Sequence, residues 1–135
     1  MEVKRKFFLT AALLVSVAHS VPALASTLST SIELKNNTSS DNALIHGTNT
    51  TGIISPLFPS PAVANSSTYH TSTTDGVADA GVLTYQSCWF SWSVIEINGY
   101  YHFAIGATPT SKCSTDVLIQ NVFTGEYKIR FNIDA

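Results

Sequence analysis

The chain has 135 residues, of which only 12% are charged, and a formal net charge of −2. Three of its seven basic residues lie within the first six positions. Residues 26–135 therefore contain four basic and eight acidic side chains, which gives this part of the chain a net charge of −4. Binding to nucleic acid or docking on anionic lipid requires clustered Lys and Arg. This composition therefore argues against both kinds of partner.

The first 25 residues have the pattern of a secretory signal peptide. Lys4, Arg5 and Lys6 form a basic start, and an apolar run of about a dozen residues follows from Phe7 to Ala18. Ala23-Leu24-Ala25 then places small residues where a signal peptidase cuts. The run is shorter than the ~20 residues that cross a bilayer, although a retained anchor is the alternative. We expect cleavage after Ala25, an exported domain at residues 26–135 without a transmembrane segment, and a bacterial source with a periplasmic or secreted address.

The first exported element is predicted to be a half-buried β-strand. Between Leu28 and Lys35, apolar residues and Thr alternate with polar and charged residues, the period of two that a strand with one buried face requires. The strand is followed by the turn-forming sequence NNTSSDN, whose side chains hydrogen-bond to nearby backbone groups.

The segment from His46 to Asp79 has no regular pattern. Its three prolines at 56, 59 and 61 predict a loop or an edge position, because proline cannot donate to a strand ladder. Short strands are expected near Gly52–Ile54 and Ser67–Ser72. A further strand is expected at Val82–Gln86, after a break at Gly81.

A hairpin is predicted between Cys88 and Ile105, a stretch that holds six of the fourteen aromatic residues. Asn98-Gly99 favours a two-residue type I′ turn, because both turn positions need a positive φ. Such a turn fixes the register, so the numbers of opposing residues sum to 197. One face of the hairpin is then largely apolar, and it assigns Phe90, Trp92 and Phe103 to the core.

The remaining aromatic residues of the hairpin are candidates for exposure and binding. They are Trp89, Tyr100 and Tyr101, and His102 lies beside them on the less apolar face near the turn. An isolated histidine in this position is typical of a solvated surface group. We take these four residues as the predicted binding site and predict no catalytic residue, no metal site and no cofactor.

Cys88 and Cys113 are expected to form a disulfide. Both lie in the exported part of the chain, where oxidation is favoured, and two cysteines allow a single pairing. In the predicted register Cys88 lies opposite Pro109, four residues before Cys113. A reactive thiol with a histidine partner is the alternative.

A second hairpin is predicted at the C-terminus. Apolar residues at 127, 129, 131 and 133 alternate with polar residues, so Tyr127–Asp134 is a half-buried strand. Thr124-Gly125 is the expected turn and Asp116–Phe123 the expected partner strand. With seven to nine strands and no helical period, the sequence predicts an all-β, single-domain antiparallel β-sandwich.

The segments IELKNNT, FPSPAVANSSTYHTSTTDG and AGVLTYQ, in that order between Ile32 and Gln86, resemble the layout of aegerolysin-like proteins. That layout has a strand ending in Asn-Asn, a Pro-rich loop, and a turn leading into a Gly-x-x-x-Tyr strand. The resemblance covers Ile32–Tyr85 and implies a secreted β-sandwich that recognises membrane lipids, in some members with a partner protein that helps to form pores. The signal peptide, the cysteine pair and the few aromatics of the Pro-rich region depart from it.

The sequence leaves three functional hypotheses. The first is an exported, non-enzymatic binding protein whose ligand is a membrane lipid or another protein. The second is a periplasmic enzyme inhibitor or immunity-type protein that uses the irregular segment Pro56–Ser72. The third is a small secreted hydrolase that depends on His70 or His102, although no Gly-x-Ser-x-Gly elbow or metal-binding spacing supports it.

Overall fold

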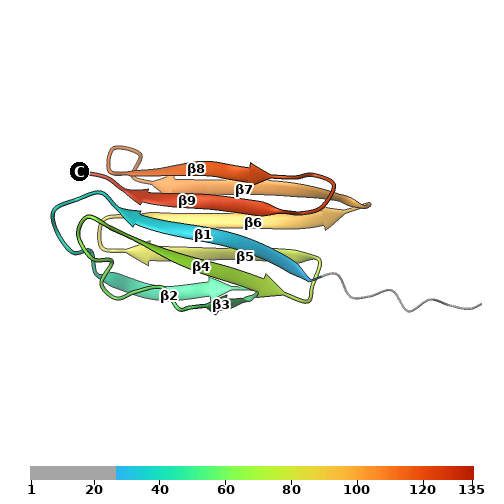
Figure 1. Cartoon of the computed structure of the whole chain (residues 1–135), viewed down its shortest axis with the longest axis horizontal. Coiled ribbons are helices and arrows are strands. Elements are labelled where there is room, and N and C mark those ends of the chain that lie inside the picture. Colours follow the sequence, from blue (N-terminus) through green and yellow to red (C-terminus); the bar gives the residue numbers. More distant parts are fainter. Residues whose placement is uncertain (1–26) are drawn as a thin grey trace, which may run out of the picture.

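The computed structural model describes residues 27–135, with 47–49 as backbone alone. Two β-sheets pack face to face, and no helix is present among these residues (Figure 1). This confirms the predicted β-sandwich. The predicted signal peptide at residues 1–25 lies outside the described part of the chain. The strands are β1 (Leu28–Asn36), β2 (Leu44–Thr50), β3 (Ile53–Ser55), β4 (Ser66–Thr74), β5 (Ala78–Tyr85), β6 (Trp89–Ile97), β7 (Tyr100–Thr108), β8 (Cys113–Gln120) and β9 (Tyr127–Ile133).

The larger sheet has five strands in the order β3-β4-β1-β9-β8, and the smaller has four in the order β2-β5-β6-β7. β1 is central in the larger sheet and has the alternating burial that its sequence predicts. It pairs with β9 in parallel, although the two strands are almost a hundred residues apart. Nothing in either strand predicts this pairing, because it depends on how the whole chain is wound.

The β6–β7 hairpin has the predicted register, from Ile97 opposite Tyr100 to Trp89 opposite Thr108. Asn98 and Gly99 both have positive φ, at 53° and 80°, as the type I′ turn requires. The inward face of β6 carries Phe90 and Trp92, and both are buried. Phe90 stacks on Phe131 of the opposite sheet with 4.6 Å between ring centroids, which places the core between the two sheets.

The segment around the prolines is more ordered than its sequence predicts. β2 was not predicted, and β5 begins at Ala78 and runs through Gly81 without a break. Position 81 of the strand requires glycine, because the ring of Trp92 on the neighbouring strand occupies the space that a Cβ atom would need. The Pro-rich stretch between β3 and β4 is fixed to the core by Phe58, which is buried, and by the Tyr85 hydroxyl, which donates to the carbonyl of Pro59 at 2.5 Å.

Cys88 and Cys113 form the predicted disulfide, with 5.8 Å between their Cα atoms. The bond joins the start of β6 in the smaller sheet to the start of β8 in the larger one. Both cysteines are buried. The disulfide therefore fixes the two sheets to each other at one end of the sandwich.

Replacing both cysteines with serine should lower the free energy of unfolding by about 3 kcal/mol, because a cross-link that closes a loop of this length restricts the unfolded chain. Chemical denaturation of the oxidised protein and of the double variant measures the difference. A denaturation midpoint equal to that of the parent protein would contradict this stabilising role.

In the region covered by the structure, no helix is long and apolar enough to cross a membrane.

Candidate functional site

The structure does not bring the four predicted binding residues together. Trp89 and Tyr100 lie at opposite ends of the β6–β7 hairpin, which at about 3.4 Å per residue separates them by roughly 27 Å. Both side chains are exposed on the outer face of the smaller sheet, and so is that of His102, which pairs with Ile95. Tyr100 and His102 are thus neighbours, whereas Trp89 belongs to the disulfide end of the molecule.

Tyr101 was predicted as a candidate for exposure, and its side chain is instead half-buried against the core. The reason is the alternation of the strand: Tyr101 shares the inward face with Phe103, while Tyr100 shares the outward face with His102. The Tyr101 ring packs over Gly125, where a Cβ atom would lie 2.8 Å from it. Gly125 also has a φ of 74°, so both the contact and the backbone favour glycine there.

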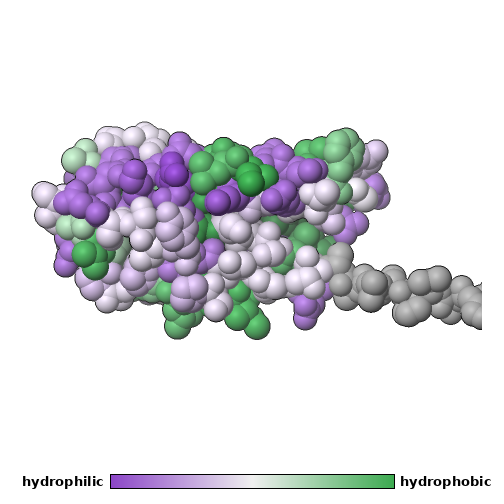
Figure 2. Space-filling model, in the orientation of Figure 1, coloured by the Kyte–Doolittle hydropathy of each residue, from purple (hydrophilic) through white to green (hydrophobic). Residues whose placement is uncertain are grey.

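Five of the exposed apolar side chains lie together at the end of the sandwich opposite the disulfide. We call this surface the apolar tip and define it by five residues from three loops or loop edges: Val77, Ile97, Tyr100, Val122 and Phe123. Phe123 is 73% exposed, Val77 62% and Tyr100 55%. In Figure 2 a hydrophobic area appears at the end where Figure 1 places the β6–β7 turn and the β8–β9 loop.

Backbone hydrogen bonds hold the loops of the apolar tip together. The amide of Tyr101 donates to the carbonyl of Val122 at 2.9 Å, and the amide of Glu96 donates to the carbonyl of Val77 at 2.8 Å. The side chain of Asn121 accepts from the amides of Phe123 and Thr124 and so shapes the β8–β9 loop. The rings of Tyr100 and Phe123 lie 6.1 Å apart and are tilted by 60°. The tip is thus a prearranged surface.

The charges near the apolar tip are acidic. Asp75 lies two residues before Val77 and Glu96 precedes Ile97, whereas Glu126, after the β8–β9 loop, lines a surface hollow together with Lys128. The cationic side chains of the described region all lie outside the tip, at positions 35, 112, 128 and 130. An anionic surface would therefore be repelled by this end of the molecule rather than attracted to it.

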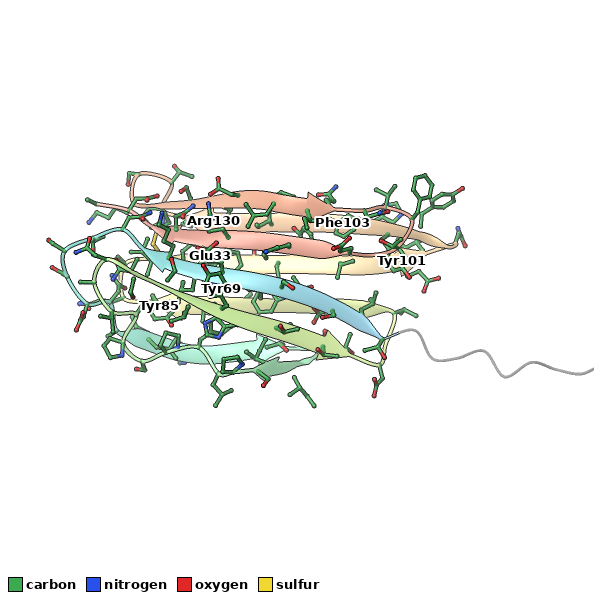
Figure 3. All side chains as sticks on the ribbon, in the orientation of Figure 1. Glu33, Tyr69, Tyr85, Tyr101, Phe103 and Arg130 are labelled. Carbon is green, nitrogen blue, oxygen red and sulfur yellow. A yellow bond between two sulfur atoms is a disulfide. The ribbon has the colours of Figure 1, made fainter. Side chains whose placement is uncertain are left out.

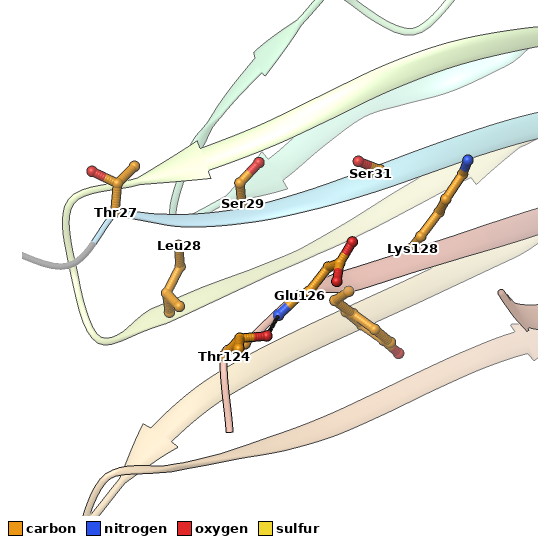
Figure 4. Close-up of a pocket in the computed structure, with 9 residues that line it drawn as sticks. Thr27, Leu28, Ser29, Ser31, Thr124, Glu126 and Lys128 are labelled. Carbon is orange, nitrogen blue, oxygen red and sulfur yellow. Dashed lines mark hydrogen bonds between the residues drawn. The ribbon is translucent and has the colours of Figure 1, made fainter. Parts of the chain in front are cut away.

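The outer face of the five-stranded sheet has a different character. Two adjoining hollows of about 470 and 220 Å³ share Ser31 and Lys128 in their walls. Figure 4 shows the larger one, where Ser29, Ser31, Glu126 and Lys128 project on one side of the sheet and Leu28 projects on the other. We call the two hollows together the polar groove.

A charged cluster lies next to the polar groove (Figure 3). Arg130 Nε donates to Glu33 Oε2 at 2.7 Å, and Arg130 Nη1 lies 3.6 Å from Asp116 Oδ2. The Glu33 hydrogen bond, with the nearby Glu33 and Asp116 charges, raises the pKa of Arg130 despite some loss of hydration. The Tyr69 hydroxyl is 3.5 Å from Glu33 Oε1. Glu33 is almost completely buried in this cluster, although it projects from the outer face of the sheet. The positive charge of Arg130 balances the charge of its carboxylate.

Two buried polar groups look catalytic in type, but their contacts are structural. His70 packs on the Phe58 ring at 4.3 Å, and its two nitrogens are bonded to the Pro56 carbonyl and the Thr68 hydroxyl. Asp79 accepts hydrogen bonds at 2.5 Å from the hydroxyls of Thr30 and Ser72 in the opposite sheet. No group of three or more His, Cys, Asp or Glu side chains in the described region could hold a metal ion.

His70 should make stability depend on pH. Burial lowers its pKa from the ordinary value of 6.5, and the hydrogen bond to Pro56 only partly opposes this. Below pH 6.5 the unfolded chain binds a proton that the folded chain resists, so stability rises with pH in this range and is lost on acidification. Urea denaturation at several pH values should show this slope in the parent protein and a flatter one in His70→Gln. An unchanged slope in the variant would contradict the assignment.

Most of the apolar tip was missed by sequence reasoning. Tyr100 was found because it follows a turn, but Val77, Val122 and Phe123 come from loops whose meeting point depends on long-range pairing. The available signal was the apolar pair Val122-Phe123, which follows Gln120 and Asn121 just past the end of β8.

No family model and no curated protein matches the chain. A solved structure with a similar fold is IP-1A from Alcaligenes faecalis, with a TM-score of 0.52 and 10% sequence identity over 83% of this chain and 94% of that one. At this identity the similarity establishes a shared fold and nothing about the site.

Proposed function

We propose that this protein is an exported, non-enzymatic binding protein that attaches to the surface of an uncharged membrane through the apolar tip. The observation that carries the proposal is the set of five exposed apolar side chains at one end of the sandwich. Exposed apolar patches of this kind are typical of interaction surfaces, because covering them removes unfavourable contact with water.

The chemistry of the tip favours a lipid surface over a protein pocket. Tyr100 combines a ring with a hydroxyl, and such side chains are enriched where hydrocarbon meets water. Phe123 protrudes beside it and would reach the acyl region once Tyr100 lay among the headgroups. The resemblance of Ile32–Tyr85 to aegerolysin-like proteins suggests the same class of ligand.

The acidic neighbours of the tip specify the kind of membrane. Asp75 and Glu96 would be repelled by anionic lipids, whereas a zwitterionic surface imposes no such cost. Binding would therefore depend on apolar burial and change little with salt.

Co-sedimentation with phosphatidylcholine vesicles tests this proposal, with a second set of vesicles that contains phosphatidylglycerol. We expect the protein to pellet with the neutral vesicles and to pellet no better, or less well, with the anionic ones. The absence of pelleting with neutral vesicles would contradict the proposal and favour a protein partner, as in the inhibitor hypothesis. Binding confined to anionic vesicles would contradict it as well.

A further inference from the structure

The polar groove lies on the outer face of the larger sheet and reaches the β8–β9 loop at one end, where Thr124, Gly125 and Glu126 line it. We propose that it binds a neutral saccharide chain. This inference concerns a second site and a second ligand, so it does not depend on the membrane proposal. Its support comes from the shape of the groove, its hydrogen-bonding groups and its charge.

The shape of the groove suits an extended ligand. Its two hollows run along β1, where Ser29, Ser31 and Glu33 project on the same face. At about 3.3 Å per residue these three positions span roughly 13 Å. The floor is a sheet held by hydrogen bonds on both sides of β1, so a ligand would meet an ordered surface.

The walls of the groove are rich in groups that both donate and accept hydrogen bonds. Among the described residues, no hydrogen bond engages the hydroxyls of Ser29, Ser31 or Thr71 with another protein group. Each hydroxyl can donate one hydrogen bond and accept two. Lys128, directly opposite Ser31 in the sheet, adds a donor. Sugar hydroxyls have the same dual character, so a saccharide could pair with this surface along its length.

Tyr69 supplies a flat platform at one end of the groove. It lies opposite Glu33 in the sheet, lines the smaller hollow, and is 64% exposed. An exposed aromatic ring can cover the C–H face of a sugar while the sugar hydroxyls bond to the polar walls. Glu33 is almost completely buried, with Arg130 bonded to one carboxylate oxygen and the Tyr69 hydroxyl 3.5 Å from the other, so the hydrogen bonds to the sugar come from the serine, threonine and lysine side chains of the groove.

The charge of the groove argues against an anionic ligand. Arg130 is engaged by Glu33 and Asp116, which leaves Lys128 as the cationic side chain of the lining. Glu126 lines the same hollow and offsets it. Phosphate sites use several convergent cations or helix N-termini. The groove is close to neutral overall, and this matches an uncharged polyhydroxyl ligand.

The test is an NMR titration of the ¹⁵N-labelled full protein with neutral hexasaccharides of glucose, N-acetylglucosamine, mannose and galactose at millimolar concentration. Inorganic phosphate is titrated in parallel. We expect saturable shifts of the amides of Ser29, Ser31, Thr71 and Lys128 with at least one saccharide, and none with phosphate. The absence of shifts with all four saccharides, shifts confined to other surfaces, or saturable binding of phosphate in the groove would overturn the proposal.

Two variants at one position sharpen the test. Tyr69→Ser should weaken saccharide binding by about tenfold, because the ring no longer covers the sugar, while Tyr69→Phe should retain most of it. Equal binding by the parent protein and Tyr69→Ser would overturn the role of the ring. Vesicles free of sugar are used for the membrane proposal, so a failure of either proposal leaves the other standing.

Discussion

Replacing Tyr100 and Phe123 together with serine should weaken binding to phosphatidylcholine vesicles by about a hundredfold. The two side chains are 55% and 73% exposed, so their burial in the membrane would contribute about 3 kcal/mol in total, and each 1.4 kcal/mol corresponds to a factor of ten in affinity. Because both are at the surface, the free energy of unfolding should change by less than about 0.5 kcal/mol. Titration of the protein with vesicles, together with chemical denaturation, measures both quantities.

Leu57→Ser is the matched control for this variant. Leu57 is 78% exposed, which is similar to Phe123, but it lies in the Pro-rich stretch after β3 and outside the apolar tip. Trp89→Ser provides a second control at the disulfide end of the same hairpin. Both single variants should bind vesicles as the parent protein does. A loss in Leu57→Ser as large as that in the double variant would show that general surface hydrophobicity, and not the tip, determines binding.

The second large effect concerns the interior of the sandwich. Asp79→Ala should lower the free energy of unfolding by about 4 kcal/mol, because it leaves the buried hydroxyls of Thr30 and Ser72 without their acceptor. All three residues are almost completely excluded from solvent, so water cannot replace the carboxylate without a rearrangement. Thermal or chemical denaturation of the variant measures the loss.

Asp79→Asn separates the hydrogen bonds from the size of the side chain. The amide fills the same space, can accept from one hydroxyl and donate to the other, and should therefore cost less than the alanine variant. Replacing the whole group by apolar residues, with Thr30→Val, Ser72→Ala and Asp79→Leu, should recover part of the stability lost in Asp79→Ala. A stability of Asp79→Ala equal to that of the parent protein would exclude a structural role for this cluster.

The local features of the fold were readable from the sequence. Asn98-Gly99 was sufficient for the register of the β6–β7 hairpin, because a two-residue turn leaves no freedom in the pairing. The alternation in β1 and β9 gave correct strands and faces. The opposing exposure of Tyr100 and Tyr101 follows from the same alternation, and placing both at the surface overlooked it.

The features that were missed depend on contacts between distant segments. β2 lacks alternating apolar residues, and its pairing with β5 is interrupted by two shifts of register, so it has no local signature. From the sequence alone Gly81 indicates a strand break, whereas in the structure β5 continues through it and the ring of Trp92 packs against it. The apolar tip and the polar groove each combine residues from strands or loops far apart in the chain, and the winding of the two sheets that joins them is not encoded in any one segment.

Hydrogen–deuterium exchange with and without phosphatidylcholine vesicles tests the central claim most directly. The proposal predicts slower exchange on vesicle binding in the β4–β5 turn, the β6–β7 turn and the β8–β9 loop, which together carry the apolar tip. Exchange should be unchanged in the β7–β8 loop and around Cys88 at the opposite end. Protection of that opposite end, or binding to vesicles without protection of the tip, would contradict the claim that the apolar tip is the membrane-binding surface.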